Sequence, residues 1–349
     1  MEPLVAAPDL ESAMRRALEL AATPEVPRGP NPRVGAVVVG ADGEVVGEGF
    51  HRGAGTPHAE VVALAAAGAR ARGGTAVVTL EPCNHIGRTG PCSEALIDAG
   101  IARVVFAQED HNPVAHGGAD RLRSAGVEVV AGVCADQARS LNREWTFAVT
   151  RGRPFVTWKV AGTLDGRVAA ADATSRWITG PAARAEVHAL RGRVDAVVVG
   201  TGTALADDPQ LTARPADGST VERQPLRVVV GRRALPEQSR LRDDSAPTWF
   251  TDHRDPAVVL QELSARECRH VLLEGGPTVA AAFLRADCVD EVVAYVAPVV
   301  LGAGRSMVDD LGIETLSSGL RFEVTDVARV GDDVRITLVR PAVTRPSEA

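Results

Sequence analysis

The sequence has few aromatic residues, and its basic residues do not outnumber its acidic ones. Trp, Tyr and Phe together make up 3% of the 349 residues, and the formal net charge is −7 at pH 7. Non-specific binding to nucleic acid requires a basic surface, and binding to single strands also uses stacking aromatic rings. The composition therefore argues against a nucleic-acid-binding protein, although a local basic pocket for a phosphate is compatible with it.

Long apolar runs and a basic leader are also absent. No apolar segment approaches the ~20 residues that a membrane-spanning helix needs. The first residues, Met1 to Val5, do not combine basic residues with a following apolar run, as a signal peptide would. The cysteines number five, an odd count that is typical of a reducing compartment. We therefore expect a cytoplasmic protein with no membrane partner.

The length and the order of the patterns predict two domains. A chain of 349 residues is long enough for a core in each of two domains. The alternation of strands and helices restarts at Phe155, after the short stretch Thr150 to Pro154. We expect a first domain over residues 1–149, a linker over 150–153 and a second domain over 154–345.

The first half alternates apolar strand patterns with helical patterns. Helices are expected over 9–22, 57–72, 91–99, 117–125 and 135–149, and strands over 34–39, 45–49, 75–80, 103–107 and 127–130. This alternation indicates an α/β domain with three layers, in which helices cover both faces of a sheet.

One stretch, from Pro57 to Cys92, contains the side chains of an open zinc site. His58 supplies an imidazole, Cys83 and Cys92 supply two thiols, and Glu60 lies two residues after the imidazole. Three protein ligands leave the fourth tetrahedral position to water, which distinguishes a catalytic zinc site from a structural one. Zinc brings the pKa of such a water close to neutrality, and Glu60 could carry protons between the water, a ring nitrogen and a leaving amine.

The spacing departs in one respect from the H-x-E…P-C-x-x-C signature of zinc deaminases. Eight residues rather than two lie between Cys83 and Cys92. This insert is polar, and its glycines at 87 and 90 permit tight turns, so it suits a binding site. Two cysteines and one histidine alone could be a structural zinc site or core residues, but the addition of Glu60, Pro82 and the polar insert favours catalysis.

With its long spacing, the segment 82–92 resembles the bifunctional riboflavin-biosynthesis deaminase–reductases. Their deaminase half carries Pro-Cys-x-His-x-Gly-x-Thr-x-Pro-Cys, and the segment matches it, with Gly90 in place of the family's usual Pro. The resemblance implies a cytidine-deaminase-like fold for the N-terminal domain. It also implies substrate-binding residues in that domain, namely Asn31, His51, Asn84, His85 and Arg88. Without the resemblance, Asn31 would be read as part of a turn and His51 as a surface histidine.

The second half, taken alone, predicts an α/β domain with anion-binding loops. Strands are expected over 155–160, 195–199, 271–273, 291–298, 322–327 and 334–339, and helices over 181–190 and 277–284. A glycine-rich loop follows at 200–203, but Leu205 stands where a Rossmann fingerprint needs its third glycine, so we exclude that fold. The amides at 200–203 and at 276–278 could cradle a phosphate, or could simply be capped strand–helix turns.

The same resemblance extends over the second half. Motifs at Lys159, 164–167, 177–179, 206–209 and 274–276 match the family's reductase half, which implies a dihydrofolate-reductase-like fold and NADPH as cofactor. The implied cofactor contacts are Ala161, Trp177, Thr203, Asp207, Gly276, Pro277 and Thr278. The implied substrate contacts are Ser175, Arg191, Leu211, Arg214 and Glu274, with the arginines suited to hold a phosphate. Lys159 is the best candidate for a catalytic or orienting role.

The resemblance therefore implies two consecutive steps of riboflavin synthesis in one chain. The first is zinc-dependent hydrolytic deamination of a diaminopyrimidinone ribosyl phosphate, with Glu60 as the proton carrier. The second is NADPH-dependent reduction of the ribosyl group to ribityl. The resemblance also implies a homodimer. Two alternatives are a nucleic-acid-editing zinc deaminase with an accessory binding domain, and a structural zinc module fused to a ligand-binding domain.

Overall fold

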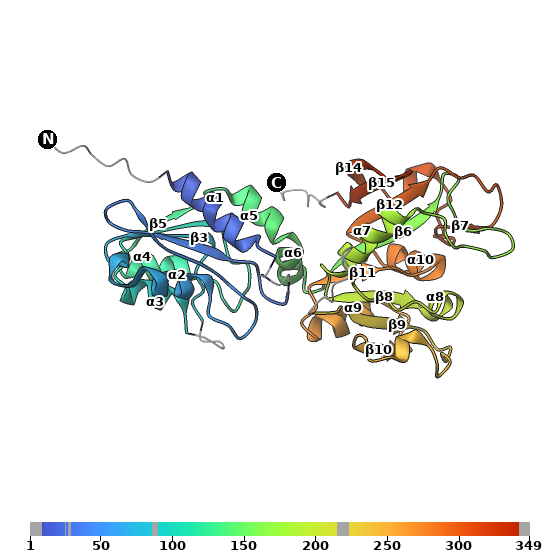
Figure 1. Ribbon diagram of the computed structural model, residues 1–349, viewed down its shortest axis with the longest axis horizontal. Coiled ribbons are helices and arrows are strands. Elements are labelled where there is room, and N and C mark those ends of the chain that lie inside the picture. Colours follow the sequence, from blue (N-terminus) through green and yellow to red (C-terminus); the bar gives the residue numbers. More distant parts are fainter. Residues whose placement is uncertain (1–8, 25, 27–28, 86–89, 215–222, 342–349) are drawn as a thin grey trace. The chain divides into compact units, whose positions relative to one another are not determined.

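The protein is described by a computed structural model that covers residues 9–24, 26, 29–85, 90–214 and 223–341 (Figure 1). The chain divides into two compact units, the first ending at Gly152 and the second beginning at Arg153. Within the described residues, no helix is both long and apolar enough to cross a membrane.

Unit 1 is built on a five-stranded sheet with the order β2-β1-β3-β4-β5. Its strands are β1 (Gly35–Val39), β2 (Val45–Phe50), β3 (Thr75–Leu80), β4 (Arg103–Gln108) and β5 (Glu128–Ala131). Its helices are α1 (Leu10–Ala21), α2 (Ala59–Ala67), α3 (Cys92–Asp98), α4 (Gly118–Ser124), α5 (Ala135–Leu141) and α6 (Arg143–Arg151), with a 3-10 turn at Gly68–Ala71. Strands β3, β4 and β5 are parallel, whereas β1 is antiparallel to both of its neighbours.

The sheet of unit 1 is buried on both faces, as the apolar runs of its strands predict. Ala36 and Val38 of β1 pack with residues of α2, α3 and α4, whereas Val37 and Val39 pack with residues of α1 and α5. Figure 1 shows these two sets of helices on opposite sides of the sheet. Because successive side chains of a strand point to opposite faces, one apolar strand serves both cores.

The expected single helix over 135–149 is wrong, because two helices stand there. α5 ends at Leu141 and α6 begins at Arg143, and Asn142 between them has a non-helical backbone. The Asn142 side chain accepts a hydrogen bond from the Arg33 amide at 2.8 Å and donates one to the Arg33 carbonyl at 2.9 Å. The expected linker also begins too early, since Thr150 and Arg151 form the end of α6.

Unit 2 is built on an eight-stranded sheet with the order β10-β9-β8-β11-β6-β12-β15-β14. These strands are β6 (Phe155–Thr163), β8 (Ala196–Gly200), β9 (Leu226–Val230), β10 (Thr248–Thr251), β11 (His270–Leu273), β12 (Glu291–Ala297), β14 (Glu323–Val330) and β15 (Asp333–Val339). A second, small sheet pairs β7 (Arg167–Ala169) with β13 (Arg305–Ser306). The helices are α7 (Pro181–Arg191), α8 (Thr201–Asp207), α9 (Pro256–Ala265) and α10 (Pro277–Arg285), with 3-10 turns at Arg240–Arg242 and Leu316–Ser318.

Helices also cover both faces of the larger sheet. α9 and α10 contribute Leu260 and Phe283 to the core on one face. α7 contributes Val187 to a core on the other face. The glycine-rich loop expected at 200–203 is wrong in part, because the chain passes directly from β8 into α8 at Thr201. Short helices of this kind bring main-chain amides to the carboxyl end of the sheet, where α/β proteins bind ligands.

Candidate active sites

The three predicted zinc ligands come together in unit 1. Nδ1 of His58 lies 3.1 Å from Sγ of Cys92 and 3.5 Å from Sγ of Cys83, and the three ligand atoms lie within 4.8 Å of one another. Zinc bonds of about 2.0 Å to nitrogen and 2.3 Å to sulfur place tetrahedral ligands roughly 3.5 Å apart. The donor set and its spacing therefore fit zinc.

Two loops and two helix starts position these ligands. His58 is the residue that caps α2, Cys83 follows the end of β3, and Cys92 is the first residue of α3. A hydrogen bond with the Cys92 side chain lowers the pKa of the Cys83 thiol. This shift favours the thiolate, which is the form that binds a metal.

Gly118 fixes the loop that carries Cys83, a role that no local sequence pattern indicates. A Cβ at this position would lie 1.7 Å from the carbonyl oxygen of Pro82, so only glycine lets the start of α4 approach the loop. Next to it, the Glu81 carboxylate accepts hydrogen bonds from the amides of Asp110 and Ala119. Both contacts hold the segment 81–83 against α4.

Glu60 lies on α2, two residues after His58, and its side chain is buried with 4% exposure. Burial raises the pKa of Glu60 to about 6. A carboxyl group that titrates near neutrality can both accept and return a proton, as a general acid–base catalyst must. The predicted proton carrier is thus placed next to the predicted zinc ligands.

Asn31 and His51 contact each other near the same ligands. Nδ2 of Asn31 lies 2.9 Å from Nε2 of His51, whose Nδ1 lies 3.1 Å from the Pro57 carbonyl oxygen. The rings of His51 and His58 meet edge to face, with centroids 5.2 Å apart. Burial lowers the pKa of His51, so the ring is neutral at pH 7. The position of His51 is thus buried beside the zinc ligands, not at the surface.

The insert between the two cysteines contributes Asn84 and His85. Asn84 is exposed, and its side-chain oxygen accepts a hydrogen bond from the Ser93 hydroxyl at 3.0 Å. Nδ1 of His85 is buried and has no hydrogen-bond partner among the residues that the structure describes. Arg88, also predicted to bind substrate, lies outside the described residues. Ser93 was missed, because nothing in its local pattern points to Asn84.

Unit 2 contains a pocket of about 470 Å³ at the carboxyl ends of β8 and β11. Of the residues predicted to bind cofactor or substrate, those that line it are Lys159, Ala161, Ser175, Thr203, Asp207, Glu274, Gly276 and Pro277. The hydroxyl of Thr203 accepts a hydrogen bond from the Gly276 amide at 3.0 Å, which joins the two predicted cofactor loops. The pocket also includes Arg305 and Met307, which the sequence analysis missed.

Lys159 is the only lysine of the whole chain, although Lys and Arg together number 38. Its side chain is half-buried on β6 and lines the pocket, and it makes no hydrogen bond or ion pair with the residues described. Burial lowers the pKa of Lys159, while the nearby charge of Glu274 opposes this shift. A chain that otherwise uses arginine as its basic residue therefore places its one primary amine in this pocket.

Arg191 and Glu274 contact each other. Nε and Nη2 of Arg191 donate to the two carboxylate oxygens of Glu274 at 2.6 and 2.8 Å, and both side chains are largely buried. Glu274 lines the pocket and Arg191 lies behind it. Arg191 also reaches the Thr212 carbonyl oxygen at 3.4 Å, and Arg214 donates to the Thr212 hydroxyl at 3.1 Å. The predicted substrate residues therefore gather around this segment.

Three other predicted residues do not line the pocket. Leu211 is buried, with 2% exposure, in the core that contains Val197. Trp177 is 70% exposed, and the Arg184 guanidinium lies 4.5 Å from the centre of its ring. The hydroxyl of Thr278 donates to a carboxylate oxygen of Asp309 at 2.6 Å.

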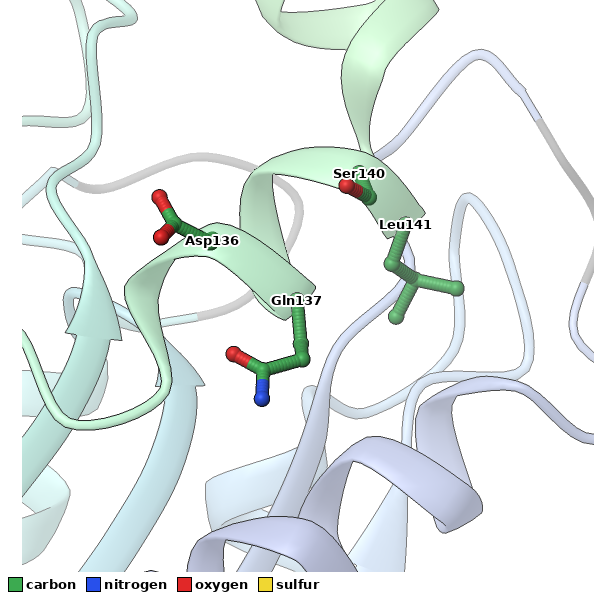
Figure 2. Close-up of a pocket in the computed structure, with 4 residues that line it drawn as sticks. All are labelled: Asp136, Gln137, Ser140 and Leu141. Carbon is green, nitrogen blue, oxygen red and sulfur yellow. The ribbon is translucent and has the colours of Figure 1, made fainter.

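A further pocket of about 520 Å³ lies along α5 in unit 1 (Figure 2). Its lining residues are Asp136, Gln137, Ser140 and Leu141, all from this one helix. Gln137 and Leu141, one helical turn apart, project to the same side in Figure 2. None of the residues predicted for either site lines this pocket, so we assign it no role.

The two halves match two different protein families. Residues 154–336 match the family described as the RibD C-terminal domain, and residues 8–108 match the cytidine and deoxycytidylate deaminase zinc-binding region. The first match covers the residues that line the pocket of unit 2, and the second covers the candidate zinc ligands of unit 1.

Similar proteins extend over nearly the full chain. The riboflavin biosynthesis protein RibD of Mycobacterium tuberculosis is 50% identical over 311 aligned positions, which cover 89% of this chain and 91% of the relative. The protein of the same name from Escherichia coli is 40% identical over 363 aligned positions, which cover 94% and 99%.

Two solved structures are also similar to this chain over nearly its full length. RibD of Acinetobacter baumannii superposes with a TM-score of 0.87 at 39% identity, covering 95% of this chain and 98% of that one. The diaminohydroxyphosphoribosylaminopyrimidine deaminase/5-amino-6-(5-phosphoribosylamino)uracil reductase of Thermotoga maritima superposes with a TM-score of 0.84 at 35% identity, with the same coverage of the two chains.

Proposed function

The chain belongs to the RibD family of riboflavin-biosynthesis proteins, and from this premise we propose the substrates and the site residues of its two reactions. Membership confirms the predicted bifunctional deaminase–reductase. It also confirms the two-part fold, cytidine-deaminase-like and then dihydrofolate-reductase-like, and the use of zinc and NADPH. The nucleic-acid-editing alternative is not favoured.

For the first reaction, the proposed substrate is 2,5-diamino-6-ribosylamino-4(3H)-pyrimidinone 5′-phosphate, which loses its 2-amino group by hydrolysis. His58, Cys83 and Cys92 would hold zinc, which makes a nucleophile available from water at neutral pH. Glu60 would accept a proton from the attacking water and pass it to the ring nitrogen, and would then transfer the second proton of the same oxygen to the departing amine. The close approach of Glu60 and the three ligands, all partly or fully buried, is the observation that carries this proposal.

Neighbouring residues would position the pyrimidine and its phosphate. Asn31 and His51, already hydrogen-bonded to each other, present an amide and a neutral ring that can bind the edge of the base. Further proposed contacts to the base and phosphate are Asn84, His85 and Arg88. The buried and unpaired Nδ1 of His85 supports a role for this residue in binding.

For the second reaction, the pocket of unit 2 would bind the deaminated product with NADPH, which supplies hydride to C1 of the ribosyl group. Ala161, Trp177, Thr203, Asp207 and the loop from Gly276 to Thr278 are the proposed cofactor contacts. Ser175, Arg191, Leu211, Arg214 and Glu274 are the proposed substrate residues, with Arg191 acting through Glu274. Lys159 orients the sugar through its Nζ, which is free to donate because no residue of the described structure binds it.

The first experiment follows NADPH absorbance with purified wild-type protein and a Glu60→Gln variant. Wild type should oxidise NADPH when given the diaminopyrimidinone ribosyl phosphate, and the variant should do so only when given the deaminated intermediate. Oxidation by the variant with the first substrate would rule out Glu60 as the proton carrier. No oxidation by either protein with the intermediate would rule out the reductase assignment.

We also propose that the protein is a cytoplasmic homodimer that does not bind nucleic acid. β14 is an edge strand of the eight-stranded sheet, and Val324 and Val327 on it are 60% and 61% exposed. Apolar side chains on an exposed edge favour pairing with a second chain. Light scattering should give twice the chain mass for wild type and a lower mass for Val327→Lys. A wild-type monomer at micromolar concentration would contradict the dimer.

A further inference from the structure

Arg233 lies at the carboxyl end of the sheet in unit 2, next to the pocket. It follows β9, whose last residue, Val230, pairs with Gly200 at the end of β8. A Cβ on Gly202 would lie 2.9 Å from Nη2 of Arg233, so the guanidinium rests against this pocket-lining glycine. The turn between β9 and Arg233 requires glycine at position 231. Gly231 has a φ of 131°, and a Cβ there would lie 2.7 Å from the Thr201 hydroxyl.

The Arg233 guanidinium has no polar partner in the part of the chain that the structure describes. Its side chain is exposed and makes no hydrogen bond or ion pair with any residue that the structure describes. Of the basic groups that line the pocket, Lys159 lies near the charge of Glu274, and Arg305 donates to the hydroxyl of Thr278 on α10. Arg232, the preceding residue, is also exposed, but only the Arg233 guanidinium approaches the pocket-lining Gly202. Arg233 therefore presents its donors at the β8–β9 side of the pocket.

A bound nicotinamide dinucleotide would extend from Lys159 towards this side. The nicotinamide must lie next to the sugar that is reduced, and the positive end of the α10 dipole, near Arg305, would suit the diphosphate. The adenosine then extends past Thr203 and Gly202 to the end of β9. NADPH and NADH differ only in the 2′-phosphate of this adenosine, and the arginine guanidinium is a common partner for a phosphate group.

We propose that Arg233 binds the 2′-phosphate of NADPH and is the residue by which this protein distinguishes NADPH from NADH. The inference rests on the proposed placement of the cofactor in the pocket of unit 2. It adds a residue that none of the motifs in the sequence indicated. The role is one of specificity, since Arg233 is far along the cofactor from the carbon that receives hydride.

The test measures dissociation constants of NADPH and NADH for the full-length protein by titration calorimetry. Arg233→Ala should weaken NADPH binding about tenfold, the size of a lost charge-assisted hydrogen bond, and leave NADH binding unchanged. Arg232→Ala is the matched control, because it removes the same charge from the neighbouring exposed position and should leave the NADPH/NADH ratio near that of wild type. Arg305→Ala should weaken both cofactors equally.

The possible outcomes separate the inference from its premise. The role of Arg233 alone would be overturned if Arg233→Ala kept the wild-type ratio of the NADPH and NADH dissociation constants. The same would follow if Arg232→Ala or Arg305→Ala, rather than Arg233→Ala, abolished the preference for NADPH. Wild type that binds the two cofactors equally while still reducing its substrate would do the same. Wild type that binds neither cofactor would overturn the placement of the cofactor as well. The fragment 2′,5′-ADP, titrated in parallel, should lose affinity in Arg233→Ala, whereas 5′-ADP should not.

Discussion

Arg191 and Glu274 form a two-hydrogen-bond ion pair behind the reductase pocket, with donor–acceptor distances of 2.6 and 2.8 Å. The pair joins the end of α7 to the residue that follows β11. Although burial opposes ionisation of Glu274, the charge and hydrogen bonds of Arg191 lower the pKa of this carboxyl group. Glu274 therefore stays ionised and fixed in direction where it faces the pocket.

Removal of Arg191 should destabilise unit 2 and impair reduction. Arg191→Met leaves a buried carboxylate without its partner, and we expect a loss of about 3 kcal/mol in the free energy of unfolding. The reductase KM should rise, while deamination by unit 1 should be unchanged. Denaturant titration and separate assays of the two steps would check this. The control is Arg193→Met, at an exposed position two residues later, which should lose neither stability nor reductase activity.

The same pair has a pH dependence with a defined sign. Because the pKa of Glu274 is lower in the folded protein, its ionisation stabilises the fold above the ordinary pKa of a glutamate, about 4.5. This stabilisation is lost as the pH falls through the folded pKa. The difference in unfolding free energy between wild type and Arg191→Met should therefore narrow below about pH 4.5. A difference that stays constant at acid pH would contradict the ion pair.

Loss of a zinc ligand should release the metal. Cys92→Ser should lower the bound zinc, measured by mass spectrometry of the metal, from one per chain to a small fraction, because a serine hydroxyl is a poor zinc ligand. Deamination should fall by a similar fraction, and reduction of supplied intermediate should persist. The control is Cys134→Ser, which replaces a half-buried cysteine at the start of α5, and this variant should bind as much zinc as wild type. Full zinc content in Cys92→Ser would contradict the ligand set.

Gly118 offers a test that leaves every ligand in place. Gly118→Ala pushes a methyl group against the carbonyl of Pro82, and overpacking of this kind costs about 1–3 kcal/mol. We expect lower zinc affinity, measured by competition with a chelator, because Cys83 is displaced with Pro82. The control is Gly90→Ala, which also lies beside a zinc ligand but has no atom within 4 Å of the added Cβ. Equal zinc affinities in the two variants would show that Gly118 has no part in holding the loop.

The buried charge of Lys159 should lower the free energy of unfolding at neutral pH, although the residue supports catalysis. Its folded pKa lies below the ordinary value of about 10.5, so between the two values the unfolded chain binds more protons and stability rises with pH. Lys159→Met removes the buried charge, so the variant should be the more stable protein at pH 7, and its advantage should shrink towards pH 10.5. Its reductase kcat should fall about 100-fold, the scale of a lost proton-transfer or orienting group.

Because the chain has one lysine, this pKa can be measured directly. Reductive methylation with labelled formaldehyde would mark Lys159 and the amino terminus alone, and NMR would follow each through its titration. A resonance that titrates at the ordinary lysine pKa would contradict the burial of this amine. Lys159→Arg keeps the charge but changes its geometry, so its reductase activity should be as low as that of Lys159→Met.

The sequence predicted those features that depend on neighbours in the chain. The strand Thr75–Leu80 was predicted with its bounds, because a short run of apolar and β-branched residues ends at a Glu-Pro pair. The candidate zinc ligands His58, Cys83 and Cys92 were recognised because they lie in local motifs, and the structure brings their ligand atoms within 4.8 Å of one another. Features that depend on distant residues were missed.

The missed features join positions far apart in the sequence. The pairing of Arg191 with Glu274 spans 83 residues, and neither residue's surroundings indicate the other. Arg305 reaches the pocket from a two-stranded sheet that no periodic pattern marks. The first turn of α8 was expected to be a loop, because Gly202 and two threonines are weak helix formers. Packing of Ala204 against the core favours the helix.

The hydrogen bonds between Asn142 and Arg33 span 109 positions and bear on how the chain folds as it is made. Arg33 lies just before β1 and two residues after Asn31, so the backbone beside this proposed substrate contact is held by a side chain synthesised much later. At ~5–20 residues per second, this delay amounts to several seconds on the ribosome. The nascent first unit should thus contain its candidate metal-binding motif, complete at Cys92, well before the backbone beside Asn31 is held in place.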